Sequence, residues 1–262
     1  MKNLKLLLGI IIGFILELGC IIFVDNAINH LIVNPALGGM AEFASRTLIF
    51  ILGYFIIEKM YKKSVAPSTK NLKKGLFVYG ATFWILFISN LIFDHKTPTM
   101  PILSCIPSVI GIIFSEMGTG VLEELVFRGF FFNAFLDRLG DTKRGVFASM
   151  ILSSSVFGLF HLLNLISYPE LFVATMAQVL YAILMGSLFC VIYYRSRNLW
   201  PCIILHGIMD FTSKFWDCFT TAPKTDYTVL LAILSVVLCL ILFISAVVQL
   251  NNEFKIKRIS QT

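Results

Sequence analysis

Long apolar runs separated by short polar stretches dominate the chain. Eight such runs have about the length that a membrane-spanning helix needs. They cover residues 4–24, 38–57, 75–93, 102–136, 145–166, 170–194, 199–219 and 227–250. Their apolar positions are continuous, whereas the strands of a membrane β-barrel alternate over about ten residues. The pattern predicts an all-α, polytopic protein with about eight transmembrane helices, built as a single membrane domain over residues 1–262.

Two of these runs depart from a simple span. The first begins with basic residues, as a signal peptide does, but no small-residue cleavage pattern follows it, so we expect a retained first span. The fourth, 102–136, is too long for one straight crossing. Pro107, Gly118 and Gly120 are the points at which we expect it to break or tilt.

The basic residues predict the orientation of the chain. Of the 21 Lys and Arg residues, 16 fall in loops and ends that alternate onto one side. Only Lys96, Lys214 and Lys224 fall on the other side, and Arg46 and Arg128 lie within spans. Because basic loops stay in the cytoplasm, both termini are predicted to be cytoplasmic.

Composition supports a membrane protein and narrows its partners. Hydrophobic residues make up 58% of the chain and charged residues 14%, against about a quarter charged in soluble proteins. The net charge of +6 is explained by basic loops facing anionic lipid, with no need for nucleic acid. The six cysteines form no CxxC or metal-like cluster, and we interpret them as small packing residues.

A few ionisable residues remain inside the predicted spans, where each costs about 2.5–3.5 kcal/mol at the bilayer centre. Glu42 and Arg46 are four residues apart and can form a structural ion pair on one helix face. Glu17 has no partner nearby in sequence. It is either protonated or in contact with another helix.

The stretch GTGVLEELVFRGFFF places three charges in one span. Glu124 and Arg128 are spaced to form a buried ion pair. Glu123 points about 100° away from that pair on a regular helix, which leaves its carboxylate available for chemistry. The alternative is that both glutamates serve one structural network around Arg128.

Two later spans add imidazoles. His161 lies one turn after Phe157, either as a packing residue or as a functional one. His206 and Asp210 share a helix face, as an Asp that orients a His would, or as a simple helix-stabilising pair. Scattering four such groups to lipid would cost on the order of 10 kcal/mol, so we expect them to meet in one hydrated cavity. A carboxylate and two imidazoles around water could carry out hydrolysis.

Three motifs, Glu123-Glu124-x-x-x-Arg128, Phe157-x-x-x-His161 and His206-x-x-x-Asp210, occur in this order, with NLWP just before the last. Together they resemble the CAAX protease and bacteriocin-processing (CPBP, or Abi) family of intramembrane proteases. The match covers roughly residues 110–220, within a catalytic core at about 102–220.

The resemblance implies roles for these residues. Glu123 would activate water with the help of His161, and His206 and Asp210 would stabilise the oxyanion. Glu124 and Arg128 would be supporting residues. The site would open toward the cytoplasm.

Asp210 departs from the Asn found in the prenyl-protein branch of this family. An ionised Asp cannot donate to an oxyanion. It is therefore protonated, or it orients His206, or a Zn²⁺ ion is held by Glu123, His161, His206 and Asp210. There is no HExxH motif, and we expect no obligatory metal.

The leading hypothesis is an intramembrane endopeptidase of the cell membrane that cleaves a membrane-associated peptide or protein. Bacteriocin or pheromone processing and bacteriocin self-immunity are the expected roles. The Lys-, Ile-, Phe- and Asn-rich composition suggests an AT-rich bacterium, which makes prenylated substrates less expected. The alternatives are a non-catalytic scaffold that binds a membrane-protein partner, and a transporter or haem carrier.

Overall fold

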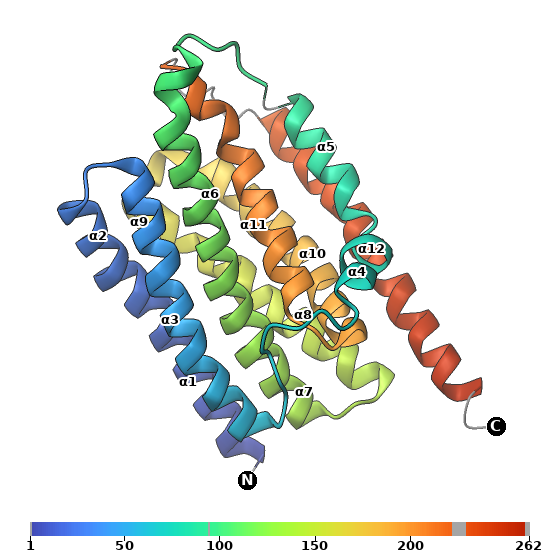
Figure 1. Cartoon of the computed structure of the whole chain (residues 1–262). Coiled ribbons are helices and arrows are strands. Elements are labelled where there is room, and N and C mark those ends of the chain that lie inside the picture. Colours follow the sequence, from blue (N-terminus) through green and yellow to red (C-terminus); the bar gives the residue numbers. More distant parts are fainter. Residues whose placement is uncertain (1, 94, 222–228, 260–262) are drawn as a thin grey trace.

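A computed structural model describes residues 2–93, 95–221 and 229–259. These residues form an α-helical bundle with no strand among them, which confirms the predicted fold class. Lys2 and Ile259, the first and last described residues, lie at the same end of the bundle (Figure 1). The first two residues of the predicted last span, 227 and 228, and the predicted outer Lys224 lie outside the described residues.

The N-terminal part forms two long helices. α1 (Lys2–Gly19) continues through the π-helical segment η1 (Cys20–Asp25) into α2 (Asn26–Leu31). α3 (Pro35–Tyr61) follows after a short turn. Asn34 fixes its start because its side chain accepts hydrogen bonds from the backbone N–H groups of Ala36 and Leu37 at 3.0 and 3.2 Å, as an N-cap does.

The third predicted span is bent. It consists of α4 (Leu72–Lys74), η2 (Gly75–Tyr79) and α5 (Phe83–Phe93), and the two arms, Leu72–Tyr79 and Phe83–Ile92, meet at 68°. Gly80 lies at the bend, where a Cβ atom would come within 2.8 Å of Leu205. The bend therefore lies directly against α11 (Trp200–Phe215).

The fourth predicted span is one continuous helical run of 38 residues, about 57 Å at 1.5 Å per residue. It comprises α6 (Ile102–Glu124), η3 (Leu125–Phe132) and α7 (Asn133–Leu139). The expected break at Pro107, Gly118 or Gly120 is wrong, because α6 passes through all three. The irregularity is the π-helical η3, which begins directly after Glu124.

The remaining helices complete the bundle, and their bounds follow in chain order. They are α8 (Lys143–Phe160), η4 (His161–Leu163), α9 (Asn164–Ser167), η5 (Pro169–Leu171), α10 (Phe172–Ser196), α11 (Trp200–Phe215), η6 (Trp216–Phe219) and α12 (Val229–Ile259). Asn198 lies just before α11, and its Oδ1 accepts from the backbone N–H of Trp200, the first residue of that helix, at 3.0 Å. Pro201 is accommodated in the first turn, where no N–H is needed.

The number of spans differs from the predicted eight. Six described helices are long and apolar enough to cross a membrane, or up to seven if the bent pair counts as one span. The difference lies at 199–219, where α11 has only 16 residues, fewer than the roughly 20 that a span needs. The protein is a multi-pass membrane protein in which this short helix packs inside the bundle.

Close packing brings α6 and α11 together (Figure 1). A Cβ atom on Gly120 would lie 2.8 Å from the carbonyl oxygen of Ile203. A Cβ atom on Gly207 would lie 2.5 Å from the sulfur of Met117. Because real Cβ atoms do not approach so closely, these two glycines set the distance between the helices that carry the predicted site residues.

Candidate active site

A buried ion pair lies at the junction of α6 and η3. Arg128 Nη1 donates to Glu124 Oε1 at 2.8 Å, and both side chains are fully inaccessible. The guanidinium carbon lies 4.7 Å from the centre of the Phe157 ring and 5.3 Å from that of Phe189, within the range of cation–π attraction. Gly186 makes room for the guanidinium, because a Cβ there would be 2.9 Å from Nη2.

The imidazole of His206 binds the same glutamate. Its Nδ1 lies 2.7 Å from Glu124 Oε1, and because a carboxylate oxygen accepts, Nδ1 is the donor. On its Nδ1 side the His206 ring is therefore not oriented by Asp210. Glu124 orients the ring instead.

The other nitrogen of His206 faces two carboxylates. Nε2 lies 3.3 Å from Glu123 Oε2 and 3.4 Å from Asp210 Oδ2. The contact between His206 and Asp210 predicted from their spacing is thus present. An ionised carboxylate can only accept hydrogen bonds, so both contacts are favourable when Nε2 carries a hydrogen.

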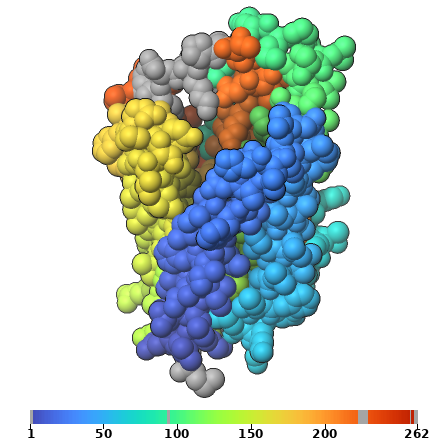
Figure 2. All heavy atoms as spheres, turned by 90° about the vertical axis from the view of Figure 1, so that its left-hand side faces the viewer, coloured from blue at the N-terminus to red at the C-terminus, as the bar shows by residue number. Residues whose placement is uncertain are grey.

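The side chains of the cluster differ in solvent exposure, with two that are buried and two that lie at an open edge. The Glu124 side chain is 0% exposed and that of His206 3%, whereas Glu123 is 20% and Asp210 29% exposed. Figure 2 shows a recess between the yellow segment around α9 and the blue segment around α2, in which orange residues of the α11–η6 region are visible. The two carboxylates at the open edge are the groups that water and a substrate would meet first.

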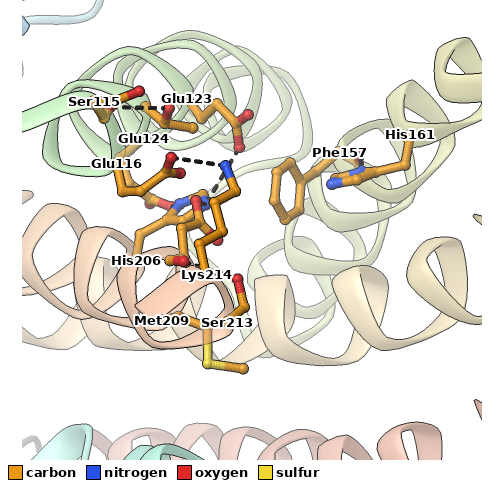
Figure 3. Close-up of polar contacts among 12 residues, drawn as sticks. Ser115, Glu116, Glu123, Glu124, Phe157, His161, His206, Met209, Ser213 and Lys214 are labelled. Atoms are coloured by element: carbon orange, nitrogen blue, oxygen red, sulfur yellow. Dashed lines mark hydrogen bonds and ion pairs between the residues drawn. The ribbon is translucent and has the colours of Figure 1, made fainter. Parts of the chain in front are cut away.

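His161 lies apart from this contact cluster. The Phe157 ring separates it from His206, with ring centroids 5.1 Å from His161 and 5.7 Å from His206 (Figure 3). Its Nδ1 is 3.1 Å from the Phe157 carbonyl oxygen. Because a carbonyl only accepts, Nδ1 carries the hydrogen and Nε2 presents a lone pair.

The donor set for a metal is not assembled in this arrangement. Within the part of the chain that the structure describes, no group of three His, Cys, Asp or Glu side chains is placed to hold a metal ion. The four residues considered as Zn²⁺ ligands do not converge, since Phe157 separates His161 from the others. In this arrangement the four residues do not fit a bound Zn²⁺ ion.

The ion pair of Glu116 and Lys214 extends the cluster and was not assigned a role from the sequence. Lys214 Nζ lies 2.7 Å from Glu116 Oε1 (Figure 3), and the Glu116 side chain is only 5% exposed. Glu116 precedes Glu123 by two helical turns, and Lys214 follows Asp210 by one. That spacing was the available signal, since it aligns the four side chains along α6 and α11.

Two predictions concern other charges inside the spans. Arg46 pairs with Glu42 at 3.5 Å as expected, but a second carboxylate, Asp25, lies closer at 2.9 Å. Glu17 is 3% exposed, and its Oε2 has no hydrogen-bond partner among the described groups.

Comparison with known proteins agrees with the three motifs. The sequence model of the family described as type II CAAX prenyl endopeptidase, Rce1-like, matches residues 105–212. That stretch runs from α6 into α11 and contains all six predicted site residues. No curated protein matches the chain. The segment that forms the candidate site is therefore similar to the Rce1-like type II CAAX prenyl endopeptidases.

Proposed function

We propose that this protein is an intramembrane endopeptidase of the cell membrane. The observation that carries the proposal is the contact of His206 with Glu123 and Asp210 at a partly exposed edge, above a buried ion pair. Such a juxtaposition of carboxylate and imidazole is suited to moving protons during peptide hydrolysis. The family match over the same residues supports the reaction class.

Glu123 is the general base in this proposal. Its carboxylate takes a proton from a water molecule as the water oxygen attacks the carbonyl carbon of the scissile peptide bond. Nε2–H of His206 donates to the oxyanion of the tetrahedral intermediate. The intermediate collapses when the C–N bond breaks and the leaving amine receives the proton from Glu123.

Asp210 and His161 assist in different ways. Asp210 Oδ2 lies 3.4 Å from Nε2 of His206, and the negative charge of this carboxylate favours a hydrogen on Nε2 at the open edge. His161 offers Nε2 as an acceptor for the attacking water. It reaches that water only after the Phe157 side chain turns away, because the ring now stands between them.

The substrate we propose is a membrane-associated peptide or a short membrane protein. A bacteriocin leader or a pheromone precursor has this chemistry, and removal of a bacteriocin would provide self-immunity. No obligatory metal takes part.

The test compares the membrane peptidomes of cells that carry wild type, Glu123→Gln or Glu253→Gln. Glu253, on α12, is a matched control because its ion pair with Arg195 lies away from the site. We expect peptides that are present with wild type and Glu253→Gln to be missing with Glu123→Gln, with their precursors retained. Identical peptidomes for all three would reject the protease.

One observation favours a second candidate, a non-catalytic scaffold that binds a membrane protein. Phe157 separates the two imidazoles, and both carboxylates at the edge already contact His206. For a scaffold, Glu123→Gln leaves the cellular phenotype unchanged. The same variant therefore distinguishes the two candidates.

A further inference from the structure

A cationic cavity lies at the end of the bundle that holds both termini, away from the candidate active site. Its volume is about 170 Å³. Buried side chains, among them Phe132, Asn133 and Tyr193, form its wall. Lys62, Lys63 and Arg197 line it as well, and they come from segments more than 130 residues apart in the chain.

The backbone at two of these cations is unusual. Lys62 ends α3 with φ 55° and Arg197 ends α10 with φ 53°, both in the left-handed region. Glycine is the usual residue there, and other residues cost roughly 1–2 kcal/mol in this conformation. Two separate helices thus end on a strained cationic residue at the same cavity.

A buried hydroxyl group with a free hydrogen lies in the wall. Tyr193 is 6% exposed, and its oxygen accepts from Asn133 Nδ2 at 2.9 Å. Asn133 Nδ2 also donates to the Gly129 carbonyl at 2.9 Å, which fixes the amide as the donor. The Tyr193 hydroxyl hydrogen then has no acceptor within the described residues, so the cavity wall offers a donor to a ligand.

The charges at the cavity are incompletely neutralised. Arg197 lies 3.9 Å from Asp141 and 4.5 Å from the centre of the Tyr194 ring. Asp141 is shared, because it also accepts from the Tyr194 hydroxyl. Lys62 makes no ion pair with any described residue. The cavity therefore has excess positive charge together with a hydroxyl donor, the combination that a phosphate group requires.

We propose that this cavity binds the phosphate of an anionic phospholipid headgroup. The cavity lies at the predicted cytoplasmic end, where basic pockets between transmembrane helices meet anionic lipid. The proposal is independent of the protease. It does connect to η3, since Asn133 Nδ2 also lies 3.3 Å from the carbonyl oxygen of Arg128. A bound phosphate would hold Tyr193, and through it Asn133, against that segment.

The experiment measures the thermal unfolding midpoint of the full chain in three settings. These are nanodiscs of phosphatidylcholine, nanodiscs with 30% phosphatidylglycerol, and phosphatidylcholine nanodiscs with inorganic phosphate. We expect phosphatidylglycerol to raise the midpoint of wild type by several degrees and inorganic phosphate to raise it less. Because each variant is compared with itself across settings, differences in basal stability cancel.

Two variants and a control locate the effect. Lys62→Gln and Tyr193→Phe should each reduce the phosphatidylglycerol-dependent shift by half or more. Lys73→Gln removes the same charge from an exposed residue of α4 outside the cavity and should leave the shift unchanged. Equal shifts in wild type, Lys62→Gln and Tyr193→Phe would reject the site. A full shift with inorganic phosphate and none with lipid would overturn the lipid assignment.

Discussion

Arg128 Nη1 and His206 Nδ1 donate to the same oxygen, Oε1 of Glu124, at 2.8 and 2.7 Å. This oxygen joins the fourth and seventh apolar segments at a point where none of the three side chains is more than 3% exposed. It neutralises a buried guanidinium and also fixes the imidazole ring. Glu124 is therefore the structural carboxylate, and its neighbour Glu123 is the one left at the open edge.

Glu124→Gln should destabilise the protein strongly. The amide removes the only carboxylate that pairs with the buried Arg128 in the described structure, and losing one partner of a buried pair costs about 3–5 kcal/mol. Thermal unfolding in a fixed detergent measures the change. Glu253→Gln, which breaks the more exposed pair with Arg195, should cost less than about 1 kcal/mol. Equal losses for the two variants would contradict the assignment.

Asp210→Asn should preserve most of the proposed peptidase activity. The carbonyl oxygen of an Asn side chain can accept from Nε2–H of His206, and its amide can donate to an oxyanion. We expect kcat/KM within about tenfold of wild type, whereas Asp210→Leu should lose about 10²–10³-fold, as when an oxyanion-stabilising group is removed. A peptide substrate identified from the peptidome provides the assay. Equal inactivity of the Asn and Leu variants would show that Asp210 must be a carboxylate.

His161→Phe tests the imidazole beyond Phe157. The His161 and Phe157 rings pack edge to face with their centroids 5.1 Å apart. A Phe ring at position 161 can keep this packing but lacks the Nε2 acceptor. We expect activity to fall by about 10²-fold, the lower range for a lost acid–base group, with an unchanged unfolding midpoint. Retained activity would show that His161 is a packing residue and not a functional one.

Removal of metal ions should leave the proposed activity intact. The described residues hold no three-ligand group for a metal, and Glu123 and His206 suffice for the proton transfers proposed above. Protein treated with a chelator and then dialysed should keep its kcat, and elemental analysis should find zinc below one atom per chain. Loss of activity that added Zn²⁺ restores would overturn the metal-free mechanism.

Contacts within one helix could be predicted from the sequence. Glu42 with Arg46, Glu124 with Arg128, and His206 with Asp210 are all four residues apart, and each contact is present. Helix geometry alone fixes which side chains share a face. The apolar runs likewise predicted the helical fold, because a spanning segment must satisfy its own backbone.

Contacts between helices could not be predicted in this way. The bond from His206 to Glu124, the Phe157 ring beside His161 and the pair of Lys214 with Glu116 depend on how far each helix is rotated and shifted. The π-helical segment after Glu124 contains no proline that would have indicated it in the sequence. Its position follows from packing against several neighbours at once.

Gly120→Ala should test whether the close approach of α6 and α11 sets the site. The added Cβ would lie 2.8 Å from the Ile203 carbonyl oxygen, so the helices must separate and lengthen the contacts of His206 with the α6 carboxylates. We expect a lower unfolding midpoint and a fall of about 10² in kcat/KM, as a displacement of 1 Å can cause. Gly19→Ala is the control, since nothing lies within 4 Å of its new Cβ, and it should change neither quantity. If Gly120→Ala behaved like Gly19→Ala, the spacing of these two helices would not determine the geometry of the site.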